Sequence, residues 1–125
     1  PAVHELSIAI SLIELAEGAA REAGAARVTA VHLRLGALSG VVREALEFSF
    51  PIAAEGTALE GARLLIEELP LVVACAPCGR DVRPEGPGSF CCPLCGTPSA
   101  TIRQGRELEI AAIEVEDPAP QPEET

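Results

Sequence analysis

The sequence predicts an α+β fold: a small three-stranded sheet packed with two helices, plus an inserted four-cysteine lobe that resembles a zinc ribbon. Two segments have apolar residues at helical spacing, and three shorter segments alternate between apolar and polar residues. Two Cys-x-x-Cys pairs stand between the second and third alternating segments. We therefore expect one domain from residues 1–70 and a returning strand at 104–116, a metal-binding lobe at 71–103, and a disordered tail at 117–125.

The first helix is expected over residues 7–23. Its apolar side chains recur every three or four positions, which places them on one face that can pack against a core. Ser7 is expected to cap the first turn, and Gly24 suits the left-handed conformation that commonly ends a helix. The predicted core-facing residues are Ile8, Leu12, Leu15, Ala16 and Ala19.

A second helix is expected over residues 41–54, and Gly56 closes the segment. Pro51 lies within this helix and removes one backbone hydrogen-bond donor, so we expect a kink or an early end there. The predicted inward-facing residues are Val42, Ala45, Leu46, Ser49 and Ile52.

Three strands complete the predicted domain, at residues 27–35, 62–69 and 106–116. The first strand alternates and stops at Gly36, which predicts that one of its faces lies on the core. The third strand changes phase near Ala111, which predicts a β-bulge. With that bulge, one face of the third strand would carry Leu108, Ile110, Ile113 and Val115.

Four of the five cysteines stand in two matched pairs. Cys75 and Cys78 form the first, Cys92 and Cys95 form the second, and a glycine follows each pair. Such a glycine lets the chain curl so that backbone amides face the sulfurs. Two turns of this kind form a four-sulfur site, most often for Zn(II), which stabilises a fold without catalysing a reaction. A redox dithiol and a rubredoxin-type iron site are the alternatives that these cysteines allow.

The fifth cysteine and the second histidine are expected to have other roles. Cys91 adjoins Cys92, but the Cys-Pro-x-Cys-Gly pattern starts at Cys92, so Cys91 is expected to be a spare thiol that can oxidise. Ligation by Cys91 in place of Cys92 is the alternative. His32 lies in the middle of a predicted strand on the face that carries Arg34, which favours a structural or solvent-facing role over metal ligation.

The charge balance is strongly acidic, since nine basic and nineteen acidic residues give a net charge of −10. A nucleic-acid partner needs clustered positive charge, so this balance argues against that class of function. No apolar run approaches the roughly 20 residues of a membrane-spanning helix, and the sequence lacks the features of a secretory signal. We therefore expect a cytoplasmic protein with no membrane partner, in which paired cysteines hold a metal ion and do not form disulfides.

Beyond these patterns, the sequence resembles the HypA/HybF family of nickel metallochaperones. The likeness begins with His-Glu-Leu-Ser at residues 4–7 and continues through Val-His-Leu-Arg-Leu-Gly at 31–36 and Glu-Gly-Ala-Arg-Leu at 60–64. It also includes both cysteine pairs and Gly-Arg-Glu-Leu at 105–108, and so covers nearly all of residues 4–116. Many unrelated ribbons share the four cysteines, whereas this order of features together is much more specific.

The resemblance implies a function in nickel delivery. Family members bind Ni(II) near the N-terminus and Zn(II) at the cysteines, and they deliver nickel with a partner GTPase to the large subunit of [NiFe]-hydrogenase, and in some cases to urease. The nickel ligands of the family correspond to the imidazole and amide nitrogens of His4 and to the amide nitrogen of Glu5, a donor set that square-planar Ni(II) accepts. The family also uses the amino group of the residue directly before the histidine, whereas residues 1–3, Pro-Ala-Val, precede His4 here.

The sequence contains no recognisable nucleophile–base pair, phosphate-binding loop or paired-carboxylate site, so it predicts a metal-delivery protein and not an enzyme. Two other functions are alternatives: a zinc-ribbon adaptor that carries no nickel, and an iron–thiolate electron carrier. The sequence leaves open which nickel enzyme is served and whether two copies form a homodimer.

Overall fold

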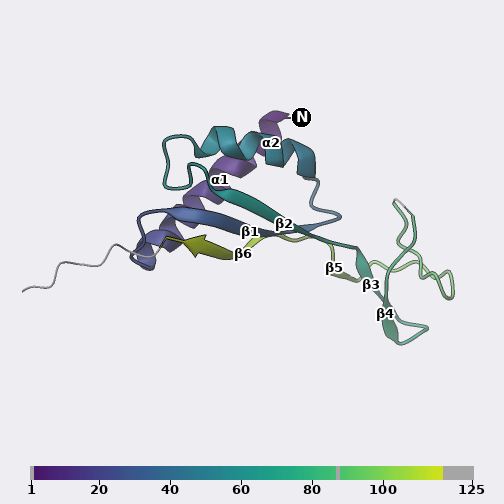
Figure 1. Ribbon diagram of the computed structural model, residues 1–125. Coiled ribbons are helices and arrows are strands. Elements are labelled where there is room, and N and C mark those ends of the chain that lie inside the picture. The colour runs from purple at the N-terminus through teal and green to yellow at the C-terminus, as the bar shows by residue number, and fades with distance from the viewer. Residues whose placement is uncertain (1, 87, 117–125) are drawn as a thin grey trace, which may run out of the picture. The chain divides into compact units, whose positions relative to one another are not determined.

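The computed structural model describes residues 2–86 and 88–116, which form two helices and six strands (Figure 1). In chain order these are α1 (Ala2–Glu22), β1 (Val28–Gly36), α2 (Arg43–Ala54), β2 (Arg63–Leu69), β3 (Val72–Cys75), β4 (Arg80–Val82), β5 (Ile102–Gln104) and β6 (Leu108–Val115). The strands form two three-stranded sheets, ordered β2-β1-β6 and β4-β3-β5. The predicted α+β fold is confirmed. The tail expected at 117–125 lies outside the described residues.

The chain consists of two compact units. The first comprises Pro1–Leu33, Val41–Ile66 and Ile110–Thr125, and it holds both helices. The second comprises Arg34–Gly40 and Glu67–Glu109, and it holds all five cysteines. The expected lobe at 71–103 lies wholly within the second unit.

Helix α1 begins at Ala2, five residues before the predicted start. Ser7 is therefore inside the helix, and the prediction that it caps the first turn is wrong. Glu5 lies in the first turn, where the positive end of the helix dipole stabilises a negative charge and so favours helix upstream of Ser7. The predicted end is confirmed, because Gly24 has a φ of 74° and its N–H donates to the carbonyl of Arg21.

The buried face of α1 differs in part from the prediction. Leu12 and Ala16 are buried as predicted, but Leu15 is 65% exposed, Ala19 is exposed, and Ile13 takes the core position that the spacing assigns to Leu15. Both sets have helical spacing, so periodicity alone does not choose between them. The buried residues of α1 are Glu5, Ala9, Leu12, Ile13, Ala16 and Ala20.

Helix α2 contains Pro51 and still reaches the predicted last residue, Ala54, so it has no early end. Leu46 and Ser49 are buried as predicted. The prediction that Ile52 and Val42 face the core is wrong, because both side chains are half exposed. Val42 also precedes the first residue of the helix. Phe50 fills the core position that the prediction missed, one turn after Leu46.

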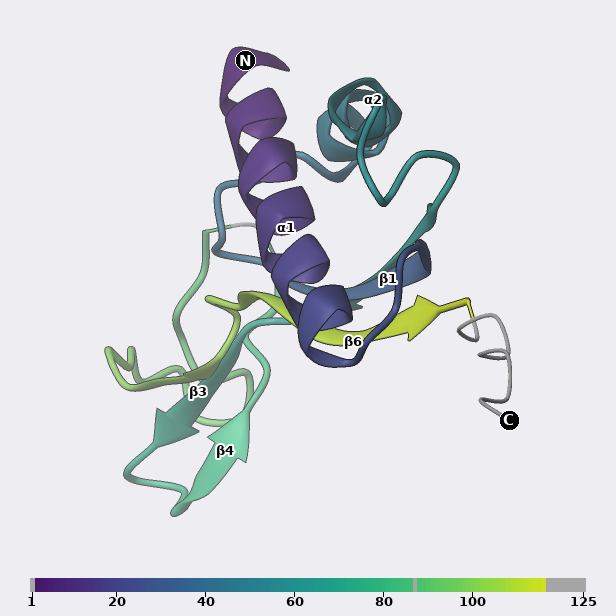
Figure 2. The same ribbon diagram turned by 90° about the vertical axis from the view of Figure 1, so that its left-hand side faces the viewer.

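The two helices cover one face of the strands in the first unit (Figure 2). The centre of that sheet is β1, whose residues Leu33 and Leu35 are buried while Arg34 is exposed, as the alternation predicts. In β6, Ile110 and Ile113 pack against the same core although they are three residues apart, which is the phase change that a bulge would produce. Leu108 was expected on that face but is 38% exposed.

The second unit has a small core of its own around β3. Val73 of β3 lies opposite Val82 of β4, and both are buried. Cys75 and Cys92 complete this cluster, with Phe90 packed against it. Two of the paired cysteines are therefore core residues of the unit, which ties its folding to whatever the cysteines hold.

Candidate metal centres

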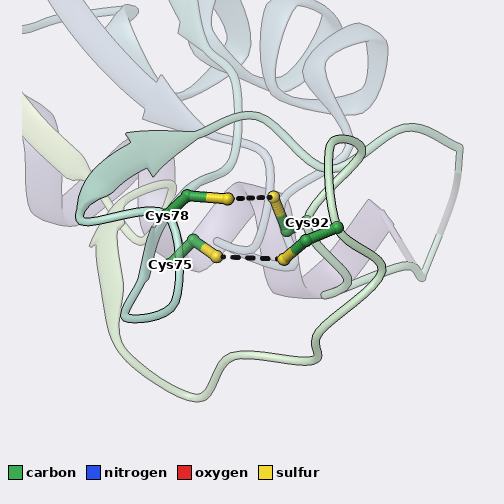
Figure 3. Close-up of side chains that lie close together, drawn as sticks. Cys75, Cys78 and Cys92 are labelled. Atoms are coloured by element: carbon green, nitrogen blue, oxygen red, sulfur yellow. Dashed lines mark hydrogen bonds between the residues drawn. The ribbon is translucent and has the colours of Figure 1, made fainter.

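The four paired cysteines come together in the second unit. Cys75 is the last residue of β3, Cys78 lies in the turn that follows, and Cys92 and Cys95 belong to a second turn. Their sulfur atoms all lie within 4.8 Å of one another. The sulfur of Cys75 is 3.5 Å from that of Cys95, and the sulfur of Cys78 is 4.0 Å from that of Cys92. Figure 3 shows the side chains of Cys78 and Cys92 pointing toward each other.

Each pair of cysteines lies on a turn that a glycine closes. Gly79 and Gly96 have φ angles of 64° and 76°, a left-handed conformation that costs glycine little. The N–H of Gly79 donates to the carbonyl of Ala76 at 3.1 Å, and the N–H of Gly96 donates to the carbonyl of Cys92 at 2.8 Å. The glycines thus have the turn-forming role that their positions after the cysteine pairs predict.

The spacing of the sulfurs fits a tetrahedral metal ion. Zinc–sulfur bonds of about 2.3 Å in a tetrahedron separate the sulfurs by about 3.8 Å. The measured distances of 3.5 and 4.0 Å lie on either side of this value. Four thiolates would fill every position of a Zn(II) ion and leave none for a substrate. Within residues 2–86 and 88–116, no other group of three or more His, Cys, Asp or Glu residues could hold a metal ion.

Two hydrogen bonds involve the sulfurs. The backbone N–H of Leu94 donates to the sulfur of Cys92 at 3.4 Å, and the thiol of Cys95 donates to the hydroxyl oxygen of Thr97 at 3.2 Å. When Cys95 is ionised the hydroxyl of Thr97 donates instead, and such donors stabilise thiolates and orient metal ligands. Sequence reasoning missed Thr97, whose only sign in the sequence is its place two residues after Cys95.

These neighbours give the thiols different pKa values when no metal is bound. The hydroxyl and amide of Thr97 lower the pKa of Cys95 to about 6. Hydrogen bonds to the sulfurs of Cys95 and Cys75 raise the pKa of Cys78 to about 12. A backbone hydrogen bond from Cys78 lowers the pKa of Cys75, but burial and the neighbouring sulfurs outweigh it and leave that pKa raised. A metal ion must therefore displace protons from Cys75 and Cys78 at neutral pH.

A hollow of about 520 Å³ opens beside Cys75. Arg80 and Arg103 line it, and the guanidinium of Arg103 lies 3.4 Å from the carboxylate of Asp81. Four thiolates around one Zn(II) would carry a net charge of −2. The guanidinium groups that line the hollow carry charge of the opposite sign, although that of Arg103 is paired with Asp81.

Cys91 does not belong to the four-sulfur group. Its side chain is exposed, and its residue forms an isolated bridge with Pro98. Its backbone N–H donates to the hydroxyl of Ser89 at 3.3 Å. This position makes Cys91 available for oxidation, whereas the neighbouring Cys92 is buried.

The residues expected to bind nickel lie in the first turn of α1. His4 has a side chain that is 55% exposed, and its Nδ1 atom is 3.4 Å from Oε2 of Glu5. The side chain of Glu5 is only 2% exposed, and its Oε2 atom has no hydrogen-bond partner among the described residues. A buried carboxylate oxygen without a donor is unfavourable, and a nearby positive charge would relieve that cost.

The burial of Glu5 was not predicted. Glu5 lies four residues before Ala9 and so continues the buried face of α1 by one turn. The spacing of Glu5 and Ala9 is visible in the sequence, but it predicts the burial of Glu5 only if the helix begins before Ser7.

His32 belongs to neither group. Its Nε2 atom is 2.7 Å from Oε2 of Glu114, and the guanidinium of Arg63 is 3.7 Å from the other oxygen of the same carboxylate. Both His32 and Glu114 are about half exposed. These contacts join β1, β2 and β6 on the surface of the first unit, in keeping with the structural role that the sequence favours.

Among the described residues, neither helix is long and apolar enough to span a membrane.

The sequence model of the family described as "hydrogenase/urease nickel incorporation, metallochaperone, hypA" matches residues 3–115. A hydrogenase maturation factor HypA from Roseiflexus sp. (strain RS-1) is 57% identical over 119 residues, which cover 95% of this chain and 97% of that protein. The protein of the same description from Chloroflexus aurantiacus (strain J-10-fl) is 55% identical over 112 residues, which cover 90% and 98%.

Two solved structures share the fold. The solution structure of the Ni metallochaperone HypA from Helicobacter pylori matches with a TM-score of 0.64 at 24% identity, over 89% of this chain and 96% of that one. A second solution structure of a HypA protein matches with a TM-score of 0.67 at 24% identity, over 91% and 97%. At this identity the likeness shows the fold, whereas the family match and the sequence relatives show descent. The chain belongs to the HypA family of nickel-incorporation metallochaperones for hydrogenase and urease.

Proposed function

We propose that this chain is a cytoplasmic nickel metallochaperone in the maturation of [NiFe]-hydrogenase, with urease as the alternative recipient. It binds Ni(II) as cargo at the start of α1, through the imidazole and amide of His4 and the amide of Glu5. With a partner GTPase it passes the ion to the large subunit of the hydrogenase. The four cysteines hold a resident Zn(II) that stabilises the second unit, and the chain itself catalyses no reaction.

The arrangement of His4 and Glu5 is the observation that carries this proposal. An exposed imidazole stands 3.4 Å from a buried carboxylate oxygen that lacks a hydrogen-bond donor. Exposure leaves the imidazole free to take up and release an ion, and the buried charge attracts a cation. Membership of a nickel-incorporation family identifies nickel as the cation to test first.

The helical first turn has a consequence for the ligand set. In a helix that begins at Ala2, the first N–H groups have no carbonyl one turn earlier, and this leaves the amide of His4 without an intrahelical acceptor. The amide of Glu5 comes three residues after the first residue of α1 and so falls at the edge of the hydrogen-bonded region. The positive end of the helix dipole also opposes a cation. Successive N–H groups of a helix point the same way along its axis, so binding one ion through both amides and the imidazole requires the first turn of α1 to open.

The proposal is tested by nickel titration of three proteins, with the mass of each N-terminus verified. His4→Ala removes the imidazole, and His32→Ala is the matched control because the chain has two histidines. We expect the wild type and His32→Ala to bind one Ni(II) with the absorbance of a square-planar nitrogen site, and His4→Ala to lose this binding. Equal binding by all three proteins would favour the adaptor alternative, in which the chain carries no nickel.

A second titration addresses the amine ligand. A chain that starts at Val3 places a free amino group directly before His4, as in the family pattern, whereas the full sequence places it on Pro1. We expect the chain that starts at Val3 to bind Ni(II) more tightly and to lose the N–H resonances of His4 and Glu5 when loaded, because amides that ligate the ion lose their protons. Retention of both N–H resonances with nickel bound would mean that the amides are not ligands.

Delivery is a separate step and needs its own measurement. Nickel-loaded chain is mixed with the apo form of the hydrogenase large subunit, with and without the partner GTPase and GTP. We expect the ion to appear in the large subunit only when the chain is present with His4 intact. If the large subunit takes up free Ni(II) as well as it takes up nickel from the loaded chain, the chain does not act in delivery.

A further inference from the structure

Helix α2 exposes a pair of large apolar side chains on its outer surface. Phe48 is 69% exposed and Ile52, one turn later, is 51% exposed. Ala45, three residues before Phe48, is half-buried and extends the same face. The spacing i, i+3, i+7 is that of a helix stripe that packs against another element.

This stripe is not used by the core of the first unit. The inner face of α2 is already filled by Leu46, Phe50 and Ala54, all of which are 1% exposed or less. Phe48 is one of three phenylalanines in the chain, and it is the most exposed large apolar residue among those that the structure describes. An adjacent exposed pair that includes an aromatic residue is typical of a binding surface, whereas single exposed apolar residues are common everywhere.

The charges around the stripe indicate the chemistry of its partner. Glu44 lies one turn before Phe48, and Glu55 follows Ile52 at the end of the helix. Neither carboxylate has a basic partner among the described residues, and the last turn of α2 has no basic residue to offset its negative helix end. Pro51 cannot donate to the carbonyl of Glu47, which leaves a further acceptor on this surface.

We propose that the surface of Ala45, Phe48 and Ile52, with Glu44 and Glu55 beside it, docks a basic amphipathic segment of another protein. The segment would place apolar side chains on Phe48 and Ile52 and lysine or arginine side chains on the two carboxylates. This docking surface goes beyond the proposed function, because it rests on α2 and does not depend on the binding of nickel at His4.

A second copy of this chain fits the surface less well. If two α2 helices packed antiparallel about residue 50, Glu44 of each copy would face Glu55 of the other. Two such like-charge pairs, in chains that each carry a net charge of −10, oppose self-association at this surface. A partner with basic residues flanking its apolar face removes this repulsion and replaces it with attraction.

The test uses the zinc-loaded full chain and a fluorescently labelled helical peptide. The peptide carries leucine at positions i, i+3, i+4 and i+7 and lysine at the others, and a matched peptide has glutamate in place of lysine. We expect the lysine peptide to bind, by fluorescence anisotropy, and the glutamate peptide not to bind. Phe48→Ser should weaken binding about tenfold or more, since a buried phenylalanine contributes at least that much.

Two further variants separate the parts of the surface. Glu44→Gln with Glu55→Gln keeps the apolar pair, and should weaken the lysine peptide about threefold and reduce the salt dependence of its binding. Leu15→Ser is the matched control, since Leu15 is 65% exposed on α1, close to the value for Phe48. It should bind as the wild type does, and all variants should melt at the same temperature because only exposed side chains change.

Three results would overturn the proposal. Equal binding of the lysine peptide by the wild type and Phe48→Ser would mean that the peptide is held by non-specific charge attraction and not by the apolar surface. Equal weakening by Leu15→Ser would show that exposed apolar area in general is responsible. Self-association of the wild type that Phe48→Ser abolishes, measured by analytical ultracentrifugation, would assign the surface to a second copy of the chain.

Discussion

The two candidate metal centres differ in how completely the folded chain prepares them. The sulfurs of the cysteine group already stand 3.5 and 4.0 Å apart, and Leu94 and Thr97 are hydrogen-bonded to two of them. At the start of α1, by contrast, the proposed ligands include backbone amides of a helical turn, and one buried carboxylate oxygen lacks a donor. A prepared and closed site suits an ion that stays, whereas a site that must rearrange suits an ion that is released.

The strongest test of this contrast removes one sulfur. Cys75→Ser should lower zinc affinity by more than about a hundredfold. Removing a residue that only hydrogen-bonds to a metal ligand already lowers affinity by up to about that amount. The second unit should lose its core, because Cys75 and Cys92 are both buried in it. Zinc content and the dispersion of amide resonances measure the two effects. Cys91→Ser is the control and should keep both zinc and fold, so loss of zinc there would place Cys91 among the ligands.

The pH dependence of zinc binding sharpens the contrast further. The raised pKa values of Cys75 and Cys78 mean that both are protonated at neutral pH without metal. Zinc binding should therefore release at least two protons, and the apparent affinity should fall by at least about a hundredfold for each unit that the pH drops near neutrality. Cys95 is already ionised there, and its protonation opposes zinc only below a pH of about 6. Calorimetry in buffers of different ionisation enthalpy counts the protons; release of fewer than two would contradict these assignments.

The opening of the first turn also requires that the rest of α1 stay anchored. Ile13→Ala should lower the free energy of unfolding by about 2–4 kcal/mol, because Ile13 is buried in the helix–sheet core. Leu15→Ala should change it by less than about 0.5 kcal/mol, because Leu15 is largely exposed. Chemical denaturation of both variants checks the difference. Equal losses would mean that α1 is rotated from the orientation described above.

Among the buried residues of α1, Glu5 has a smaller expected effect on stability than Ile13. Glu5→Gln keeps the shape of the side chain but removes its negative charge, so stability should stay within about 1 kcal/mol of the wild type or rise. Nickel affinity should nevertheless fall if the carboxylate attracts the ion. Thermal melting and nickel titration of the same sample compare the two effects. A large loss of stability with unchanged nickel binding would make Glu5 a structural residue only.

Much of the fold could be predicted because local chemistry specifies it. The end of α1 at Gly24, the alternation of β1 and the turns after Cys78 and Cys95 each depend on residues within a few positions. Cysteine spacing likewise predicted which sulfurs meet, since ligand geometry restricts the turn that carries them.

The errors lie where local sequence permits two answers. Ile13 and Leu15 both fit a helical stripe, and the packing of α1 against α2 and the sheet decides which is buried. Ser7 is a good capping residue, but the sequence before it is also compatible with helix, so the helix extends to Ala2. The buried carboxylate of Glu5 could not be foreseen without that extension. The part of the candidate nickel site that the sequence missed therefore follows from one misplaced helix boundary.

Gly36 has a consequence for how related chains can vary in length. Its N–H donates to the carbonyl of Glu107, and a side chain at this position would collide with the backbone of Gly105. The N–H of Leu38 donates in turn to the carbonyl of Gly105. Because the two backbone segments are in direct contact and hydrogen-bonded, an added or deleted residue beside Gly36 or Gly105 would shift the register of both segments. Natural insertions should instead accumulate at residues 83–86, which are mostly exposed and lie outside the strands, so that extra residues there disturb no strand pairing.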